Sequence, residues 1–162
     1  MIRIEIEMKT YTDLVNDCLQ HIDELFPWDL SEELEQGQQL LLVDISEPYE
    51  YARLHIPGSI NVPRGVLESA SEYDYEETVP ELAAGRDRDI VLICRSGNRS
   101  ALAACTLQQM GFTKVRSLKT GLRGWNDYEQ PLVDADGNTV DIDEADDYFT
   151  TRLRPEQQKP SE

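Results

Sequence analysis

Residues 89–110 read DIVLICRSGNRSALAACTLQQM, and this stretch decides the fold. Asp89–Ile93 is a short apolar run without polar alternation, which is typical of a strand covered on both faces in a parallel sheet. Ser100–Met110 is rich in helix-forming residues and is closed by Gly111, so it predicts a helix. We therefore expect a central strand, a six-residue loop and a helix, in this order.

The loop Cys94–Arg99 places a cysteine where the strand ends and the helix is about to begin. Unpaired N–H groups at a helix start carry partial positive charge and favour a thiolate or a bound anion. Gly97 and Asn98 tolerate the backbone angles that turn successive N–H groups inward, and Arg95 and Arg99 add positive charge. The pattern predicts a nucleophilic cysteine in an anion-stabilising cradle. The alternative is a cysteine that only fills space at a strand end.

Signals for strands and helices alternate along the rest of the chain. Leu40–Asp44 is an apolar run that predicts a strand, Ile60–Val62 predicts a shorter one, and another is expected between Gly111 and Leu118. Short helices are expected at Ser31–Glu35, Pro48–Leu54 and Glu77–Ala84. This alternation predicts an α/β fold, with a central parallel sheet of about five strands and helices on both faces.

The two ends of the chain differ from the middle. Apolar residues recur at helical spacing from Thr12 to Phe26, so residues 1–30 predict an N-terminal extension with an amphipathic helix. That helix should pack against the body of the fold, and a homodimer contact through it stays open as an alternative. Residues 131–162 predict an acidic C-terminal tail that is partly disordered, because its end is polar and contains proline.

Composition limits the partners of the chain. Its 162 residues carry 15 Lys and Arg against 32 Asp and Glu, which gives a formal net charge of −17. Nucleic acid and anionic membranes should repel such a chain, so we expect neither as a partner. The three cysteines have no CxxC spacing, which indicates neither a disulfide framework nor a zinc site and fits a reducing cytoplasm. Asp134–Asp141 lacks the glycine and glutamate positions of a calcium loop, so it predicts a hairpin turn instead.

Four stretches, in order along the chain, resemble a known family. CRSGNRS at Cys94–Ser100 is similar to the active-site loop of the rhodanese family of sulfurtransferases, especially its single-domain members. The other three stretches are Leu42–Tyr51, His55–Pro63 and Thr120–Trp125. Four ordered motifs are far more specific than any one of them alone. The resemblance implies a rhodanese-like domain over residues 31–130.

The resemblance also implies a chemistry. Cys94 would be the nucleophile of a thiosulfate sulfurtransferase and would carry the transferred sulfur as a persulfide, with no metal or other cofactor. The donor would be a small anion, and two arginines in the loop favour a compact dianion such as thiosulfate. The acceptor would be cyanide or a thiol. The residues expected to bind the donor are Arg95, Ser96, Gly97, Asn98, Arg99, Ser100 and Arg64.

Asp44 and His55 are expected to support the site from outside the loop. Asp44 ends a strand at the carboxyl edge of the sheet, where ligands of open α/β sheets bind. The resemblance implies an arginine two residues further on, but this chain has Ser46 there. The replacement partners that the sequence offers to Asp44 are Arg95, Arg99 and Arg64. His55 stands in a His-Ile-Pro-Gly turn, where we expect a structural role, with a catalytic base as the alternative.

Two other functions stay open. Phosphatases and arsenate reductases of the same fold also place a cysteine and an arginine around an oxyanion. The phosphatases have five residues between the two, whereas four separate Cys94 from Arg99, so the loop should fit a sulfur atom better than a phosphoryl group. The second alternative is a non-catalytic sulfur carrier or docking module.

Overall fold

A single parallel sheet organises the molecule. The computed structural model describes residues 6–161, and its five strands lie in the order β1-β5-β4-β2-β3. Their bounds are Asp23–Leu25 (β1), Leu41–Asp44 (β2), Ile60–Asn61 (β3), Ile90–Ile93 (β4) and Val115–Leu118 (β5). Every pairing is parallel, and β4 lies in the centre between β2 and β5. The expected α/β fold with a parallel sheet of about five strands is confirmed.

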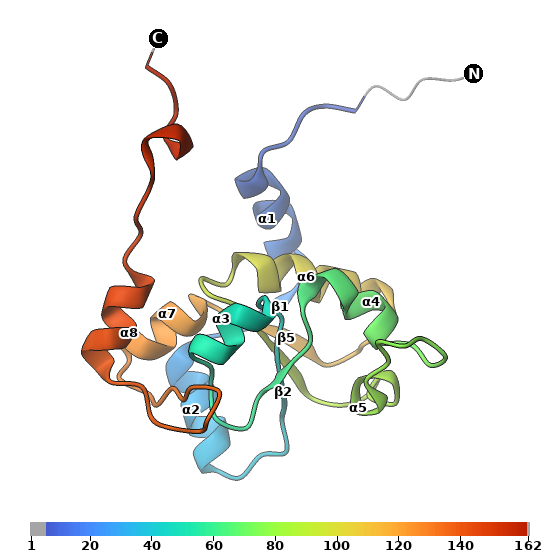
Figure 1. Ribbon diagram of the computed structural model, residues 1–162. Helices are drawn as coiled ribbons and strands as arrows, with labels where there is room; N and C mark the ends of the chain where they lie inside the picture. The colour runs from blue at the N-terminus through green and yellow to red at the C-terminus, as the bar shows by residue number, and fades with distance from the viewer. Residues whose placement is uncertain (1–5, 162) are drawn as a thin grey trace.

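Helices cover both faces of this sheet (Figure 1). The α-helices are Tyr11–Leu19 (α1), Pro27–Glu35 (α2), Pro48–Arg53 (α3), Leu67–Ala70 (α4), Pro80–Ala83 (α5), Asn98–Gln109 (α6), Gly121–Asp127 (α7) and Ile142–Phe149 (α8). Two short 3₁₀ turns complete the described elements, at Arg64–Val66 (η1) and Pro155–Gln157 (η2). No described helix is long and apolar enough to span a membrane.

The side chains of β4 supply two separate cores. Ile90 and Leu92 join the core under α1, α4, α5 and α6, whereas Val91 and Ile93 join the core under α2, α7 and α8. All four side chains are fully buried. Because successive residues of a strand point to opposite faces, a strand with helices on both sides is apolar throughout. This explains the unbroken apolar run from which the central strand was predicted.

The prediction of one helix from Thr12 to Phe26 is wrong. The N-terminal helix α1 ends at Leu19, and Asp23–Leu25 forms β1, which pairs with β5 at the edge of the sheet. Ile22 packs in the core under α1 and Leu25 in the opposite one. Their three-residue spacing imitates a helix, but the two side chains point to opposite faces of the sheet. Part of the expected extension is therefore a strand of the sheet itself.

The C-terminal segment also contributes structure that the sequence analysis did not predict. Asp141 caps α8 by accepting a hydrogen bond from the backbone N–H of Asp143, and Ala145 and Phe149 of this helix are buried. Before α8, Val133 pairs with His55 through backbone hydrogen bonds in both directions, each 2.9 Å long. Gly137 at φ +81° lies in the expected turn between Val133 and Thr139. Much of the segment expected to be a tail thus packs on the body of the fold.

Candidate active site

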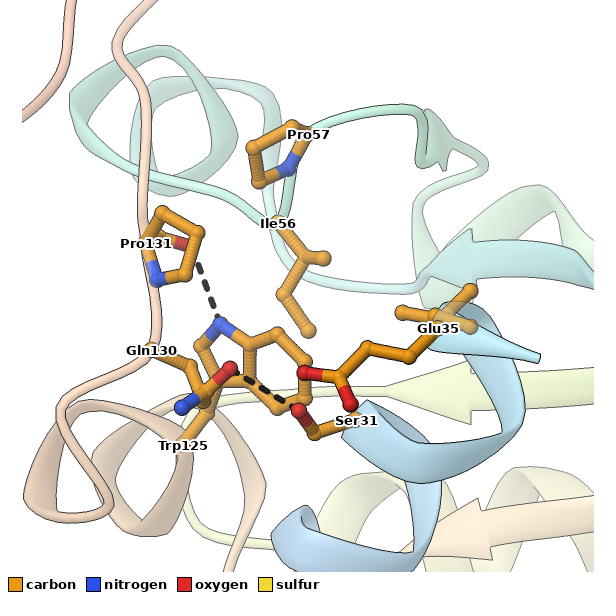
Figure 2. A pocket seen from close by; sticks show the side chains of 8 residues that line it. Ser31, Glu35, Ile56, Pro57, Trp125, Gln130 and Pro131 are labelled. Atoms are coloured by element: carbon orange, nitrogen blue, oxygen red, sulfur yellow. Dashed lines mark hydrogen bonds between the residues drawn. The ribbon is translucent and has the colours of Figure 1, made fainter. Parts of the chain in front are cut away.

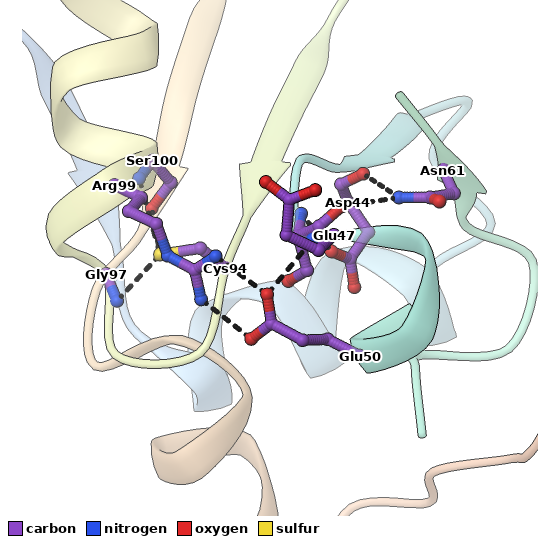
Figure 3. Close-up of polar contacts among 9 residues, drawn as sticks. Asp44, Glu47, Glu50, Asn61, Cys94, Gly97, Arg99 and Ser100 are labelled. Carbon is purple, nitrogen blue, oxygen red and sulfur yellow. Dashed lines mark hydrogen bonds and ion pairs between the residues drawn. The ribbon is translucent and has the colours of Figure 1, made fainter. Parts of the chain in front are cut away.

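Backbone amides of the loop point at the sulfur of Cys94. The N–H groups of Gly97 and Ser100 donate to Cys94 Sγ at 3.1 and 3.3 Å, and the Ser100 hydroxyl lies 3.4 Å from the same atom. Figure 3 shows the sulfur enclosed by the turn that leads into α6. The first residue of α6 is Asn98, two residues earlier than expected, so the sulfur also faces the positive end of a helix. This arrangement stabilises negative charge on sulfur.

The sulfur lies inside the protein in this conformation. Cys94 is fully buried, and the Ser100 hydroxyl that contacts it shares a 2.7 Å hydrogen bond with the hydroxyl of Ser117 on β5. Ser96 and Asn98, on the outer side of the loop, are exposed. A molecule that reacts with the sulfur can therefore reach it only when side chains at the mouth of the loop move.

The start of α7 holds the loop from outside. The N–H of Leu122 donates to the carbonyl of Cys94 at 2.9 Å, and that of Arg123 donates to the carbonyl of Arg95 at 3.0 Å. Gly121 has φ +60°, and a Cβ atom there would lie 2.4 Å from the Cys94 carbonyl oxygen. The last of the four sequence motifs, Thr120–Trp125, therefore fixes the backbone of the cysteine loop through close contacts that only glycine permits.

Arg99 is bound by a carboxylate. Its guanidinium makes two hydrogen bonds with Glu50 of α3, at 2.8 and 2.9 Å, and the Glu50 side chain is only 12% exposed (Figure 3). Burial alone would raise the pKa of Glu50, but hydrogen bonds from Arg99 and from the backbone of Glu47 hold it below its ordinary value. Half of the positive charge that the sequence places in the loop is therefore balanced by Glu50.

Arg95 points toward α8. Its Nη2 donates to the carbonyl of Tyr148 at 2.9 Å, and its guanidinium carbon lies 4.9 Å from the centre of the Tyr148 ring and 5.5 Å from that of Phe149. Burial raises the pKa of Tyr148, and the charge of Glu50 raises it further while Arg95 opposes this. Glu50 and the two loop arginines thus form one charged group at the mouth of the loop.

Arg64 is engaged elsewhere on the protein. It pairs with Glu68 one turn along, at 2.7 Å, and donates to the hydroxyl of Thr106 in the second half of α6 at 3.3 Å. Thr106 lies two turns beyond the start of that helix. The structure therefore gives Arg64 partners away from the cysteine loop, and its expected role in donor binding stays a prediction.

The prediction that Asp44 pairs with one of three arginines is wrong. Asp44 is fully buried, its Oδ1 accepts a hydrogen bond from the N–H of Ser46 at 2.9 Å, and its Oδ2 has no partner among the described residues. The buried Ser46 hydroxyl likewise has no partner there. Burial raises the pKa of the Asp44 carboxyl group, while hydrogen bonding with Ser46 and the neighbouring His55 oppose this rise. The missing family arginine is thus not replaced.

His55 occupies a structural position. Its Nδ1 donates to the carbonyl of Tyr51 at 2.7 Å, and the two rings stack at 3.7 Å with an 8° angle between their planes. Its backbone forms the bridge to Val133. These contacts fit the role that we expected in preference to that of a catalytic base.

The N-terminal helix forms a wall of the loop. Val15 and Leu19 of α1, together with Ser96, Gly97 and Asn98, line a cavity of about 190 Å³. Tyr11 precedes Val15 by one turn and belongs to the same face of the helix. Burial raises the pKa of Tyr11, and the neighbouring Cys94 acts in the same direction while Arg99 opposes it. α1 therefore contributes one wall of the cavity beside the loop.

A second pocket lies apart from the cysteine loop. It has a volume of about 270 Å³ and lies beside Trp125, whose indole N–H donates to the carbonyl of Pro131 at 2.9 Å (Figure 2). Ser31 and Ile56 also line it, and none of the expected site residues does. Trp125 is buried. Over residues 6–161, no three His, Cys, Asp or Glu side chains are grouped so that they could hold a metal ion.

The site has three members that sequence reasoning missed: Glu50, Tyr148 and Phe149. Glu50 follows Pro48 in the first turn of α3, and this acidic position is typical of any helix start, so it gave no signal of a partner on another element. Tyr148 and Phe149 lie at the end of α8, a short helix capped by Asp141. This capping residue was the sequence signal that could have predicted the helix.

The fold and the loop define the family. The family model of the rhodanese-like domain matches residues 27–128, a range that includes the whole Cys94–Ser100 loop and α7. The chain belongs to the rhodanese-like family, and the resemblance inferred from the four motifs is confirmed.

Two relatives show the range of proteins to which the chain is similar. A sulfurtransferase from Allochromatium vinosum is 32% identical over 116 residues, which cover 72% of this chain and 99% of that protein. The putative sulfur carrier protein YrkF from Bacillus subtilis is 33% identical over 95 residues, which cover 58% of this chain but only 45% of YrkF.

Solved structures agree on the fold. One is a protein of unknown function from Rhodopseudomonas palustris, described as a possible tyrosine phosphatase. It is 28% identical with a TM-score of 0.70, and the match covers 80% of this chain and 98% of that protein's chain. A thiosulfate sulfurtransferase from Pseudomonas aeruginosa has a TM-score of 0.63 at 24% identity, over 80% of this chain and 23% of its own.

Proposed function

We propose that the protein is a thiosulfate sulfurtransferase with Cys94 as its nucleophile. The Cys94 thiolate attacks the outer sulfur of thiosulfate and forms a new S–S bond. The original S–S bond breaks, and sulfite leaves with its electron pair. Cys94 then carries a persulfide whose terminal sulfur is negatively charged.

The second step returns the enzyme to its starting state. Cyanide or the thiolate of a thiol attacks the terminal sulfur, the S–S bond to Cys94 breaks, and the Cys94 thiolate leaves with the electron pair. The products are thiocyanate with cyanide, or a new persulfide with a thiol. No net oxidation occurs over the two steps, and the cycle needs no metal or other cofactor.

One observation carries this proposal: the N–H groups of Gly97 and Ser100 converge on Cys94 Sγ at 3.1 and 3.3 Å. Preorganised amides of this kind stabilise a thiolate and the negative charge that returns to Cys94 in the second step. The sulfurtransferase relative from A. vinosum, matched over nearly its whole length, supports the same chemistry. We assign Arg95 and Arg99 to the orientation of the donor.

The direct test is a mass measurement. Wild-type protein treated with thiosulfate and digested should gain one sulfur atom, about 32 Da, on the peptide that contains Cys94. Cys94→Ser should gain none there, and Cys105→Ser should behave as wild type because Cys105 lies further along α6, outside the loop. A wild-type protein that stays unmodified would overturn the proposal.

Turnover separates this function from its rivals. A sulfurtransferase releases thiocyanate from thiosulfate and cyanide over many cycles, whereas a sulfur carrier loads once and waits for a specific partner. Hydrolysis of an aryl phosphate would instead favour the phosphatase function that the R. palustris description raises. We expect no such hydrolysis, because only four residues separate Cys94 from Arg99.

A further inference from the structure

Arg95 is held by a part of the chain that lies outside the matched family domain. The match ends at residue 128, whereas the residues around the guanidinium, Tyr148 and Phe149, end helix α8. We call these two residues the Arg95 seat. The seat is itself fixed in place, because Phe149 is 3% exposed and packs in the core with Trp125 and Leu132.

The contacts of the seat restrict both the position and the orientation of the guanidinium. One hydrogen bond, from Nη2 to the Tyr148 carbonyl at 2.9 Å, fixes one corner of the group. The two rings, at 4.9 and 5.5 Å, contribute cation–π attraction. Apart from Tyr148, no described residue accepts a hydrogen bond from the Arg95 guanidinium, so part of its donor capacity is left for a ligand.

The seat matters because the second loop arginine is already neutralised. Arg99 forms two hydrogen bonds with Glu50, so the pair carries no net charge. Arg95 is then the cation that gives the group at the mouth of the loop its excess positive charge. Its placement should decide how well an anion is drawn toward Cys94.

We propose that Tyr148 and Phe149 are positioning residues that hold Arg95 for recognition of an anionic donor. This inference rests on the proposed function for its substrate, and it adds α8 to the active site. A held cation loses less conformational freedom when the anion binds than a free arginine would, so the seat strengthens binding of the donor. It has no part in the bond changes at sulfur.

The main test replaces Tyr148 by leucine. Tyr148→Leu removes the aromatic face but keeps the backbone carbonyl, and it should raise the KM for thiosulfate about three- to tenfold. The kcat should stay within about twofold of wild type, because the loop amides are unchanged. Tyr148→Phe keeps the aromatic face and should restore the wild-type KM. Tyr73→Leu is the matched control, since Tyr73 is 56% exposed, lies between α4 and α5, and has no described contact with Arg95 or Tyr148.

A second readout does not depend on sulfur transfer. Iodoacetate and iodoacetamide both alkylate cysteine and are close in size, but only iodoacetate is an anion. The rate of Cys94 alkylation by iodoacetate divided by the rate with iodoacetamide reports how strongly the site attracts negative charge. Both rates are followed by peptide mass spectrometry. Tyr148→Leu should lower this ratio about three- to tenfold, whereas Tyr73→Leu should leave it unchanged.

The outcomes are distinguishable. If wild-type Cys94 gains no sulfur from thiosulfate, the proposed function fails, and the alkylation ratio still tests the seat. If Tyr148→Leu leaves the KM and the ratio at their wild-type values, or lowers the KM, the inference fails. A fall in kcat alone with an unchanged ratio would also overturn it, because that result indicates a general disturbance of the loop. Urea unfolding of each variant shows whether it is folded.

Discussion

The cradle around Cys94 and the charged group at its mouth are built in different ways. The cradle consists of backbone: N–H groups of Gly97 and Ser100 on the sulfur, and N–H groups of α7 on the loop carbonyls. The charged group consists of side chains from two segments, Glu50 on α3 and the two arginines of the loop, joined by the Glu50–Arg99 ion pair. The difference teaches that the nucleophilicity of Cys94 and the choice of donor are separable here. Substitutions that move the backbone of the cradle should affect the nucleophilicity of Cys94, and substitutions of the charged side chains should affect the choice of donor.

The largest effect is expected from a substitution that displaces the backbone of the cradle. Gly121→Ala should destabilise the protein by about 4 kcal/mol and lower kcat/KM more than a hundredfold, because its Cβ would lie 2.4 Å from the Cys94 carbonyl oxygen. Urea unfolding and thiocyanate release measure the two effects.

Gly137→Ala is the control for backbone strain. Gly137 also has a positive φ, +81°, but an added Cβ would meet nothing within 4 Å. We expect a loss of about 1–2 kcal/mol from the left-handed conformation alone and unchanged turnover. Equal losses of stability and turnover in Gly121→Ala and Gly137→Ala would mean that the close contact between Gly121 and the Cys94 carbonyl is unimportant.

A smaller effect is expected from the charged group. Glu50→Gln leaves Arg99 with a weaker partner and should cost about 1–2 kcal/mol of stability. It should lower kcat/KM for thiosulfate about tenfold, because Arg99 loses its fixed position. Alkylation of Cys94 by the neutral iodoacetamide should not change, since the amide cradle stays intact.

The chain contains a matched ion pair outside the loop and its charged group. Glu33 and Arg116 also form two hydrogen bonds, at 2.8 and 2.9 Å, and both side chains are partly buried. Glu33→Gln should therefore cost about as much stability as Glu50→Gln while leaving sulfur transfer at the wild-type rate. A loss of activity in both variants would show that stability, not the position of Arg99, limits turnover.

The smallest effect is a difference in pH dependence between Asp44 and Glu50. The pKa of Glu50 is lowered in the folded protein, so its contribution to stability is present above the ordinary pKa of 4.5 and is lost as the pH falls through the folded-state pKa. The pKa of Asp44 is raised, so its ionisation costs stability once the pH rises above the ordinary value of 3.8.

Unfolding free energies of Glu50→Gln and Asp44→Asn, relative to wild type, should therefore change in opposite directions with pH. The Glu50→Gln deficit should shrink as the solution is acidified below pH 4.5. Asp44→Asn should gain on wild type as the pH rises above 3.8. Parallel curves for the two variants would contradict the assigned environments.

The sequence was informative where local signals and tertiary structure agree. Ile90–Ile93 is apolar at every position, which is typical of a strand covered on both faces, and in the following loop Gly97 stands three residues after Cys94. The strand at Asp23–Leu25 could not be found, because three residues at the sheet edge hold too little pattern to outweigh an apparent helical repeat.

Partners of the charged residues were harder to predict. Asp44 was expected to bind an arginine, yet it is Glu50, six residues later, that binds Arg99. A sequence shows which charges exist but not how far each side chain reaches across the fold. The approach of α8 to Arg95 is a contact over 53 residues, and no periodicity encodes it.

That contact has a consequence for the newly made chain. Ribosomes add roughly 5–20 residues per second, so the 53 residues between Arg95 and Tyr148 take about 3–10 s to synthesise. During this interval the cysteine loop can leave the ribosome without α8 beside it. Each molecule thus exists for some seconds with Arg95 unrestrained, before the last helix arrives and completes its surroundings.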